Sequence, residues 1–127
     1  MKITKKNLLR FSKQIILKKL GMSGQKKIFS SKVLVVGAGG LGCPLILYLA
    51  NSGVGNIGII DDDKIEITNL NRQILYTPKD LGKFKASQAR NIVKIINADI
   101  KVKIYKKRLN ENNIKKIFIE YDIICDG

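Results

Sequence analysis

The stretch LVVGAGGLG, residues 34–42, decides the fold of this 127-residue chain. Its glycines have the spacing GxGxxG, and they follow the β-branched run VLVV at 33–36. A helical segment at 41–50 begins within the loop; it is apolar on almost all sides, which predicts that it is buried. Glycines in such a strand–loop–helix unit allow a tight turn, and they let a phosphate approach the backbone N–H groups where the helix begins. The stretch therefore predicts an α/β nucleotide-binding fold without identifying the nucleotide.

Strand and helix signals alternate along the rest of the chain. Further strands are expected at 57–60, 101–107 and 122–125, and helices are expected around Ala89–Ile96 and at 114–121. Parallel strands joined by right-handed crossovers in the order 3-2-1-4 fit this pattern, and the lysine-rich third strand then lies at an edge. We therefore expect a Rossmann-like, doubly wound, mostly parallel sheet of about four strands.

Two helices are expected before this sheet. The first begins at a cap provided by Thr4 and ends at Gly21, because apolar residues recur at helical spacing between them. The second covers about 23–30. The sequence is accordingly divided into N-terminal helices at 1–31 and a nucleotide-binding domain at 32–127.

The composition excludes some classes of protein. The chain is 45% hydrophobic, and it has neither a signal peptide nor an apolar run of the roughly 20 residues that span a bilayer, so a globular cytoplasmic protein is expected. Cys43 and Cys125 lack CxxC spacing and the chain has no histidine, which indicates buried free thiols and no zinc ligands. The net charge of +14 comes from 20 lysines and four arginines without interleaved aromatics, which favours solvated lysine faces over a polyanion site.

An acidic run follows the second expected strand. Asp61 lies about 24 residues after the first glycine of the loop, where a carboxylate accepts hydrogen bonds from a ribose in dinucleotide-binding folds. The loop and this carboxylate together predict a ribonucleotide site at the carboxyl ends of the strands. Asp62 and Asp63 are interpreted either as part of the site or as solvated carboxylates.

The next segment, NLNRQILYTPKDLGKFKASQAR at 69–90, favours a triphosphate. It offers Asn69, Arg72, Gln73 and Lys85. At about 100° per residue, Lys85 falls in the middle of the apolar stripe of its helix, where its charge adds to the positive end of the helix dipole. Its ammonium group therefore needs an anion or must reach water. Several cations around a nucleotide are typical of phosphoryl or nucleotidyl transfer, whereas hydride transfer does not need them.

These blocks resemble the ThiF/MoeB/HesA family, bacterial relatives of ubiquitin-activating enzymes, over residues 7–127. The matching blocks are RFSKQIIL and GQKK before the first strand, VLVVGAGGLGCP, YLANSGVGNIGIIDDD, NLNRQILY, DLGKFKA and YDIICDG. The resemblance implies the nucleotide-binding portion of an adenylyltransferase that uses ATP and Mg²⁺. Its implied partners are a ubiquitin-like sulfur-carrier protein ending in Gly-Gly, whose terminal carboxylate it adenylates for thiamin or molybdopterin type sulfur transfer, and a second copy of itself in a homodimer.

The resemblance also implies roles for individual residues. Those roles are nucleotide contact for Gly39 and Gly42, ribose binding for Asp61, and phosphate contact for Asn69, Arg72 and Lys85. Lys13 stands where the family's RYxRQ motif has an arginine that reaches the partner's ATP; lysine keeps the charge and loses the bidentate fork. Arg72, Lys85 and, in trans, Lys13 are therefore the catalytic candidates. The complete candidate nucleotide site is Gly37, Gly39, Gly40, Gly42, Asp61, Asp63, Asn69, Arg72, Gln73 and Lys85.

The last block matches only the beginning of a family motif, D-x-x-D-N. Asp126 matches its first aspartate, so the magnesium-binding aspartate is expected just beyond Gly127, and the chain is expected to be truncated at its C-terminus. Zinc is bound in full-length relatives, but its cysteine pairs do not occur here. Alternatives are a tRNA-modifying, ATP-dependent dehydratase of the same superfamily, an inactive nucleotide-binding or dimerisation module, and an NAD dehydrogenase. The activity of the 127 residues alone is left open.

Overall fold

The computed structural model describes residues 1–127. Its centre is one sheet of four parallel strands in the order β3-β2-β1-β4. The strands are β1 (Lys32–Val36), β2 (Asn56–Ile60), β3 (Lys101–Tyr105) and β4 (Ile123–Asp126). This order confirms the doubly wound, Rossmann-like α/β fold, and it places the lysine-rich β3 at an edge.

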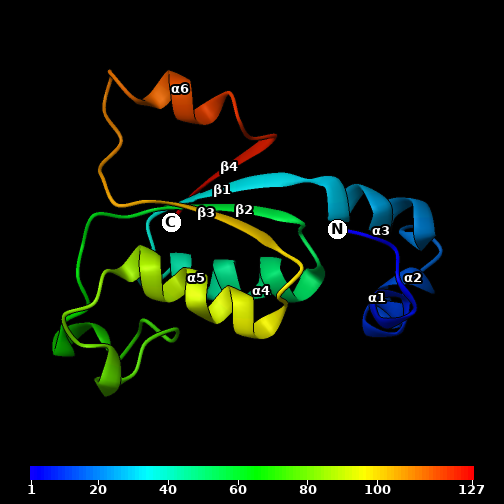
Figure 1. Ribbon diagram of the computed structural model, residues 1–127, viewed down its shortest axis with the longest axis horizontal. Helices are drawn as coiled ribbons and strands as arrows, with labels where there is room; N and C mark the ends of the chain where they lie inside the picture. Colours follow the sequence, from blue (N-terminus) through cyan, green and yellow to red (C-terminus); the bar gives the residue numbers. More distant parts are fainter.

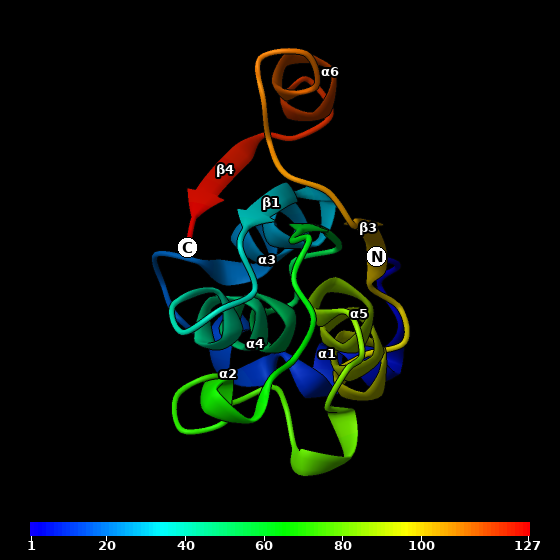
Figure 2. The ribbon, with the colours of Figure 1, turned by 90° about the vertical axis from the view of Figure 1, so that its left-hand side faces the viewer.

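Helices cover the two faces of the sheet unequally. Helices α4 (Gly42–Ser52) and α5 (Lys85–Ile96) lie together under one face, while the short α6 (Ile114–Phe118) lies alone over the other (Figures 1 and 2). Alternate residues of a strand point to opposite faces. Val33 and Val35 therefore pack in the main core with α4 and α5, and Leu34 packs in the smaller cluster under α6. Burial on both faces explains why residues 33–36 of β1 are an unbroken apolar run.

Helix α4 corrects one expectation, because only part of its surface is buried. Ile46 is fully buried against the sheet, but Tyr48 is 72% exposed and Leu41, just before the helix, is 76% exposed. The helix has more apolar surface than a single sheet face can cover.

The N-terminal region also differs from expectation: it forms three helices instead of two. They are α1 (Lys5–Arg10), α2 (Ser12–Ile15) and α3 (Gly21–Ser30). Thr4 caps the first as predicted, since its Oγ1 accepts a hydrogen bond from the backbone N–H of Asn7 at 3.2 Å. The helix stops at Phe11 instead of continuing to Gly21, which begins α3.

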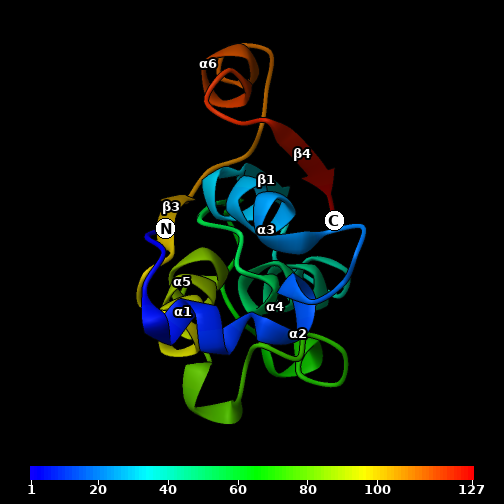
Figure 3. The same cartoon turned by 90° about the vertical axis from the view of Figure 1, so that its right-hand side faces the viewer.

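Phe11 provides the physical reason for this break. Its backbone has φ −102° and ψ 13°, outside the helical region, and its side chain is 1% exposed. The ring packs edge-on against Phe29 of α3, with 5.1 Å between the ring centroids. Burial of a large aromatic side chain outweighs the hydrogen bonds of one more helical turn. Beyond the break, α1 and α2 lie across the C-terminal ends of α5 and α4 (Figure 3), where Arg10 donates to the carbonyl of Ile96 and Gln14 to that of Ser52.

Two further expectations concern cysteines and membranes. Both cysteines are free thiols; Cys43 is fully buried and Cys125 is partly buried. No helix in the structure has the length and apolar character needed to cross a membrane.

Candidate nucleotide site

The glycine loop connects the carboxyl end of β1 to α4. Gly37 has φ +90°, a conformation that favours glycine, and its N–H donates to the carbonyl of Ile60 at 2.8 Å. At Gly42 a side chain would overlap the carbonyl oxygen of Gly37, so the first turn of α4 can pack against the loop only if this residue is glycine. The GxGxxG spacing therefore meets real steric requirements of the turn.

The backbone at the start of α4 has free hydrogen-bond donors. The N–H groups of Gly39, Gly40, Leu41 and Gly42 make no hydrogen bond within the chain. They lie at the N-terminus of an eleven-residue helix, where the helix dipole places partial positive charge. An anionic group is the ligand that this end of the helix accommodates best.

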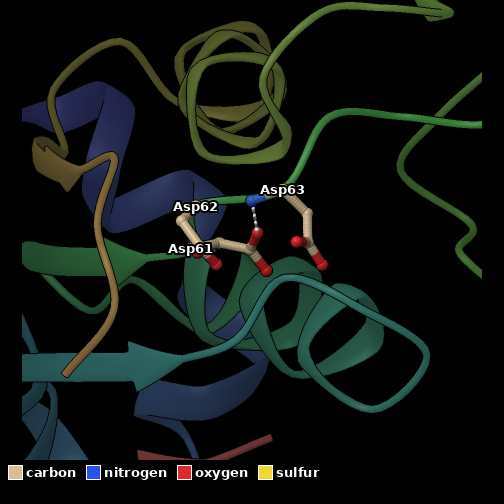
Figure 4. Close-up of side chains that lie close together, drawn as sticks. All are labelled: Asp61, Asp62 and Asp63. Atoms are coloured by element: carbon tan, nitrogen blue, oxygen red, sulfur yellow. Dashed lines mark hydrogen bonds between the residues drawn. The ribbon is translucent and has the colours of Figure 1, made fainter. Parts of the chain in front are cut away.

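The side chain of Asp61 is hydrogen-bonded to this loop. Its Oδ2 accepts the backbone N–H of Ala38 at 2.8 Å. Its Oδ1 accepts the backbone N–H of Asp63, also at 2.8 Å (Figure 4). An ionised carboxylate has about four acceptor positions, so two remain for a ligand. Asp61 thus holds the loop in shape and still has acceptors available to a ribose.

The three consecutive aspartates form a compact acidic cluster. One carboxylate oxygen from each of Asp61, Asp62 and Asp63 lies within 4.8 Å of the others. Each carboxylate already has a partner, however: Asp61 binds two backbone N–H groups, Asp62 lies 3.5 Å from Arg108, and Asp63 lies 3.4 Å from Lys85. Asp62 and Asp63 thus face cations of the chain and Asp61 holds the loop, so we assign no Mg²⁺ to this cluster. The aspartate expected beyond Gly127 stays a prediction.

Lys85 is the first residue of α5, and its position confirms the analysis of the helical stripe. The residue is only 6% exposed, as expected for a side chain in the core-facing stripe. Its Nζ lies 3.4 Å from Oδ2 of Asp63, so the ammonium group is paired with a carboxylate of the same chain. The two residues line a hollow of about 160 Å³ that also includes Lys64, Glu66 and Asn69.

The segment between β2 and α5 brings Arg72 and Gln73 to the glycine loop. A methyl group at Gly40 would lie 3.7 Å from Cγ of Arg72, and one at Gly39 would lie 3.7 Å from Nε2 of Gln73. The guanidinium group of Arg72 is exposed, and it donates to the carbonyl of Thr68 at 2.9 Å. Gln73 is 3% exposed, and its Oε1 has no hydrogen-bond partner. Arg72 and Gln73 therefore lie beside the loop, whereas Asn69 and Lys85 line the hollow beside Asp63.

The segment between β2 and α5 has regular structure of its own. It contains two 3₁₀ helices, η1 (Ile67–Asn69) and η2 (Pro78–Asp80). The side chain of Asn69 takes part in the capping box of η1, in which its Oδ1 accepts the backbone N–H of Glu66 at 2.9 Å. The side chain of Asp80 takes part in the capping box of η2 with Thr77, and Asp80 is 4% exposed. Burial favours a higher pKa for Asp80, but hydrogen bonds from the Thr77 backbone, Lys83 Nζ and the Thr77 hydroxyl together lower that pKa below its ordinary value.

Lys13 does not join the site within one chain. It is exposed on α2, at the end of the sheet opposite the glycine loop (Figure 1). Its neighbour Gln14 donates to the carbonyl of Ser52 at 3.1 Å, at the far end of the helix that begins at the loop. Contact with a nucleotide in trans remains a prediction for Lys13.

Three residues near the site were missed by the sequence analysis. A cavity of about 370 Å³ lies between the loop, the acidic run and the turn after β3. Its walls include Lys107, Arg108 and Leu109, with Arg108 Nε 3.5 Å from Oδ2 of Asp62. Residues 101–107 were expected to form a strand, but β3 ends at Tyr105. The rule that sites in parallel sheets lie at the carboxyl ends of strands was the available signal for this turn.

Comparisons with known proteins agree with this geometry. Among curated relatives, the adenylyltransferase and sulfurtransferase MOCS3 of Culex quinquefasciatus is 46% identical over 126 residues, which are 99% of this chain and 29% of the relative. The sulfur carrier protein adenylyltransferase of Thermus thermophilus is 40% identical over 127 residues, which are 100% of this chain and 47% of the relative.

A solved structure, the tRNA N6-threonylcarbamoyladenosine dehydratase TcdA of E. coli in complex with ATP, matches with a TM-score of 0.92 and 26% identity over 100% of this chain and 52% of that chain. The chain thus spans between 29% and 52% of the length of these three proteins. The model of the ThiF family matches residues 11–127. With the strand order, the glycine loop and the acidic run in place, this match shows that the chain belongs to the ThiF family.

Proposed function

We propose that this chain forms the ATP-binding part of an enzyme that adenylates the C-terminal glycine carboxylate of a ubiquitin-like sulfur-carrier protein. The observation that carries the proposal is the row of unpaired N–H groups from Gly39 to Gly42 at the start of α4, with the side chain of Arg72 beside Gly40. The relatives named as adenylyltransferases, and a neighbour solved with ATP, support this choice of nucleotide and reaction.

The chemistry explains why so much positive charge is useful. A carboxylate oxygen of the carrier attacks the α-phosphorus of ATP, the bond between that phosphorus and its bridging oxygen breaks, and pyrophosphate leaves with the electron pair. The nucleophile and the phosphate are both anionic, so cations are needed to offset their repulsion and the charge that develops on the leaving group. The nucleophile is already deprotonated near neutral pH, and therefore the site needs no general base.

Asp61, Asn69 and Lys13 complete the proposed arrangement. Asp61 accepts hydrogen bonds from the ribose through the acceptor positions that the loop leaves free. Asn69 and Gln73 offer amides beside the phosphates. Lys13 supplies charge to the site of a partner in a homodimer, with less geometric precision than the bidentate fork of an arginine.

Calorimetry and mass spectrometry test the proposal in two steps. The chain is titrated with ATP, and with NADH as the dinucleotide control; ATP should bind and NADH should not. ATP and carrier proteins ending in Gly-Gly are then supplied, and the carrier–AMP adduct is sought by mass spectrometry, with a carrier lacking the terminal glycine pair as the matched control. Failure to bind ATP, or binding of NADH in preference, would overturn the proposed nucleotide site.

A second candidate is an ATP-dependent tRNA dehydratase. The ATP-bound structural neighbour is named as such an enzyme, and the net charge of +14 would suit an RNA partner. The identities of 40% and 46% with named adenylyltransferases, against 26% with this neighbour, favour the carrier protein. ATP hydrolysis that tRNA stimulates and a Gly-Gly carrier does not would reverse this preference.

A further inference from the structure

Tyr76 connects the middle of the glycine loop to the segment that carries Arg72 and Gln73. Its side chain is 5% exposed, and its hydroxyl group donates to the carbonyl of Ala38 at 2.7 Å. The same oxygen lies 3.5 Å from the carbonyl of Lys85, the first residue of α5. A hydroxyl group has only one hydrogen to donate, so the shorter contact to Ala38 is the principal bond.

The bond to Ala38 fixes the direction of one peptide group. A trans peptide is planar, and its C=O and N–H point in opposite directions. The carbonyl of Ala38 is turned into the core, where it accepts from Tyr76 and, at 3.4 Å, from the thiol of Cys43. The N–H of Gly39 belongs to the same peptide group, so it must point out of the core, and it is one of the donors without a partner in the chain.

The two ends of the Ala38 residue are thus held by different parts of the chain. Asp61 accepts its N–H at 2.8 Å, and Tyr76 donates to its carbonyl. Ala38 itself is fully buried and offers no side-chain polar group that could hold this orientation. If the hydroxyl group of Tyr76 were missing, the peptide between Ala38 and Gly39 would keep only the weak thiol donor of Cys43.

We propose that Tyr76 is a positioning residue that aims the N–H of Gly39 at the phosphates of the bound nucleotide. The inference rests on the proposed function, because it requires a phosphate-bearing ligand at the loop. Tyr76 touches no substrate itself. It acts through the Ala38–Gly39 peptide, and it sets this peptide relative to the backbone at the start of α5, from which Lys85 extends.

The substitution Tyr76→Phe tests this role, because it removes one oxygen and leaves the ring in place. Calorimetric titrations with ATP and with adenosine separate positioning from general loss of structure. We expect ATP to bind about tenfold more weakly, as loss of one oriented charge-assisted donor predicts, and adenosine to bind with unchanged affinity. The matched control is Tyr121→Phe, which removes a hydroxyl group that lies 3.0 Å from the Tyr105 hydroxyl on the α6 face of the sheet.

Each outcome has a distinct meaning. Weaker binding of ATP alone, with an unchanged control, supports the inference. Equal ATP binding by wild type and Tyr76→Phe overturns the inference and leaves the proposed function intact, and so does an equal loss of affinity for ATP and adenosine, which would indicate a structural role. A wild-type chain that binds no ATP overturns both. The midpoint of thermal unfolding is measured for every variant, so that a fall in affinity is compared only between folded proteins.

Discussion

Replacement of Lys85 by methionine gives the sharpest test of the phosphate site. Methionine has an unbranched side chain of similar reach, so it fills the same buried space without the charge. The ion pair that is lost contains Asp63, whose side chain is 63% exposed, and such a pair contributes only about 0–1 kcal/mol to stability. The ammonium group itself is nearly buried, and its desolvation offsets much of that gain. We therefore expect the free energy of unfolding to change by less than about 1 kcal/mol.

The affinity for ATP should fall far more than the stability. A hydrogen bond from a charged group contributes about 1.5–3 kcal/mol. That energy corresponds to a rise in the Kd for ATP of about 10- to 150-fold. Calorimetric titration measures the Kd at fixed ionic strength, because salt weakens every electrostatic contact, and urea unfolding measures the stability of the same samples.

Arg90→Met is the matched control for this substitution. Arg90 is exposed on the same helix, and its replacement removes the same unit of charge from the chain. A Kd for Lys85→Met within twofold of the wild-type value would refute the assignment of Lys85 to the phosphates. A similar loss of affinity in Arg90→Met would show that net charge, and not the position of Lys85, is responsible.

Three further substitutions test other parts of the structure. Both carboxylate oxygens of Asp61 accept backbone N–H groups, so in Asp61→Asn the amide NH₂ group must face one of these donors. Urea unfolding should then show that the free energy of unfolding falls by about 1–3 kcal/mol. An unchanged free energy of unfolding would contradict the anchoring role of Asp61. The pKa of Asp80 is lower in the folded chain than in the unfolded one, so its contribution is present above about pH 4 and disappears as the pH falls through the folded pKa. Asp80→Asn should therefore reduce stability near pH 7, and its unfolding free energy should converge with that of wild type in strong acid; a constant difference at all pH values would contradict this. In Gly58→Ala the new methyl group overlaps the ring of Tyr121, at a cost of about 1–3 kcal/mol; the cost should largely vanish in a Tyr121→Ala background, and an equal cost there would exclude the clash as its cause.

The features that could be predicted from the sequence are those that local sequence patterns determine. The strand order followed from the alternation of strands and helices together with the handedness of crossovers, and the edge position of β3 followed from its lysines. The position of Lys85 on the core-facing stripe of α5 followed from helical periodicity alone. In each case the physical requirement acts between residues that are close in sequence, so the sequence displays it directly.

The features that were missed depend on contacts between distant residues. Helical spacing continues past Phe11, and only the packing of its ring against Phe29 explains why the helix breaks there. Tyr76 lies in the segment between β2 and α5, and its hydrogen-bond partner, Ala38, is 38 residues away. A tyrosine that anchors a loop and a tyrosine on the surface have the same local sequence signal.

The turn after β3 shows that topology can supply what a motif does not. Because β2 and β3 are parallel and Ile60 pairs with Tyr105, the residues that follow these two positions must emerge side by side. The bond from the N–H of Asp61 to the carbonyl of Tyr105, at 3.0 Å, continues the ladder, and the ion pair between Asp62 and Arg108 follows from the same adjacency. Once the strand order 3-2-1-4 is accepted, the basic residues after β3 therefore belong beside the acidic run, although nothing in their own sequence distinguishes them from the other lysines and arginines of this chain.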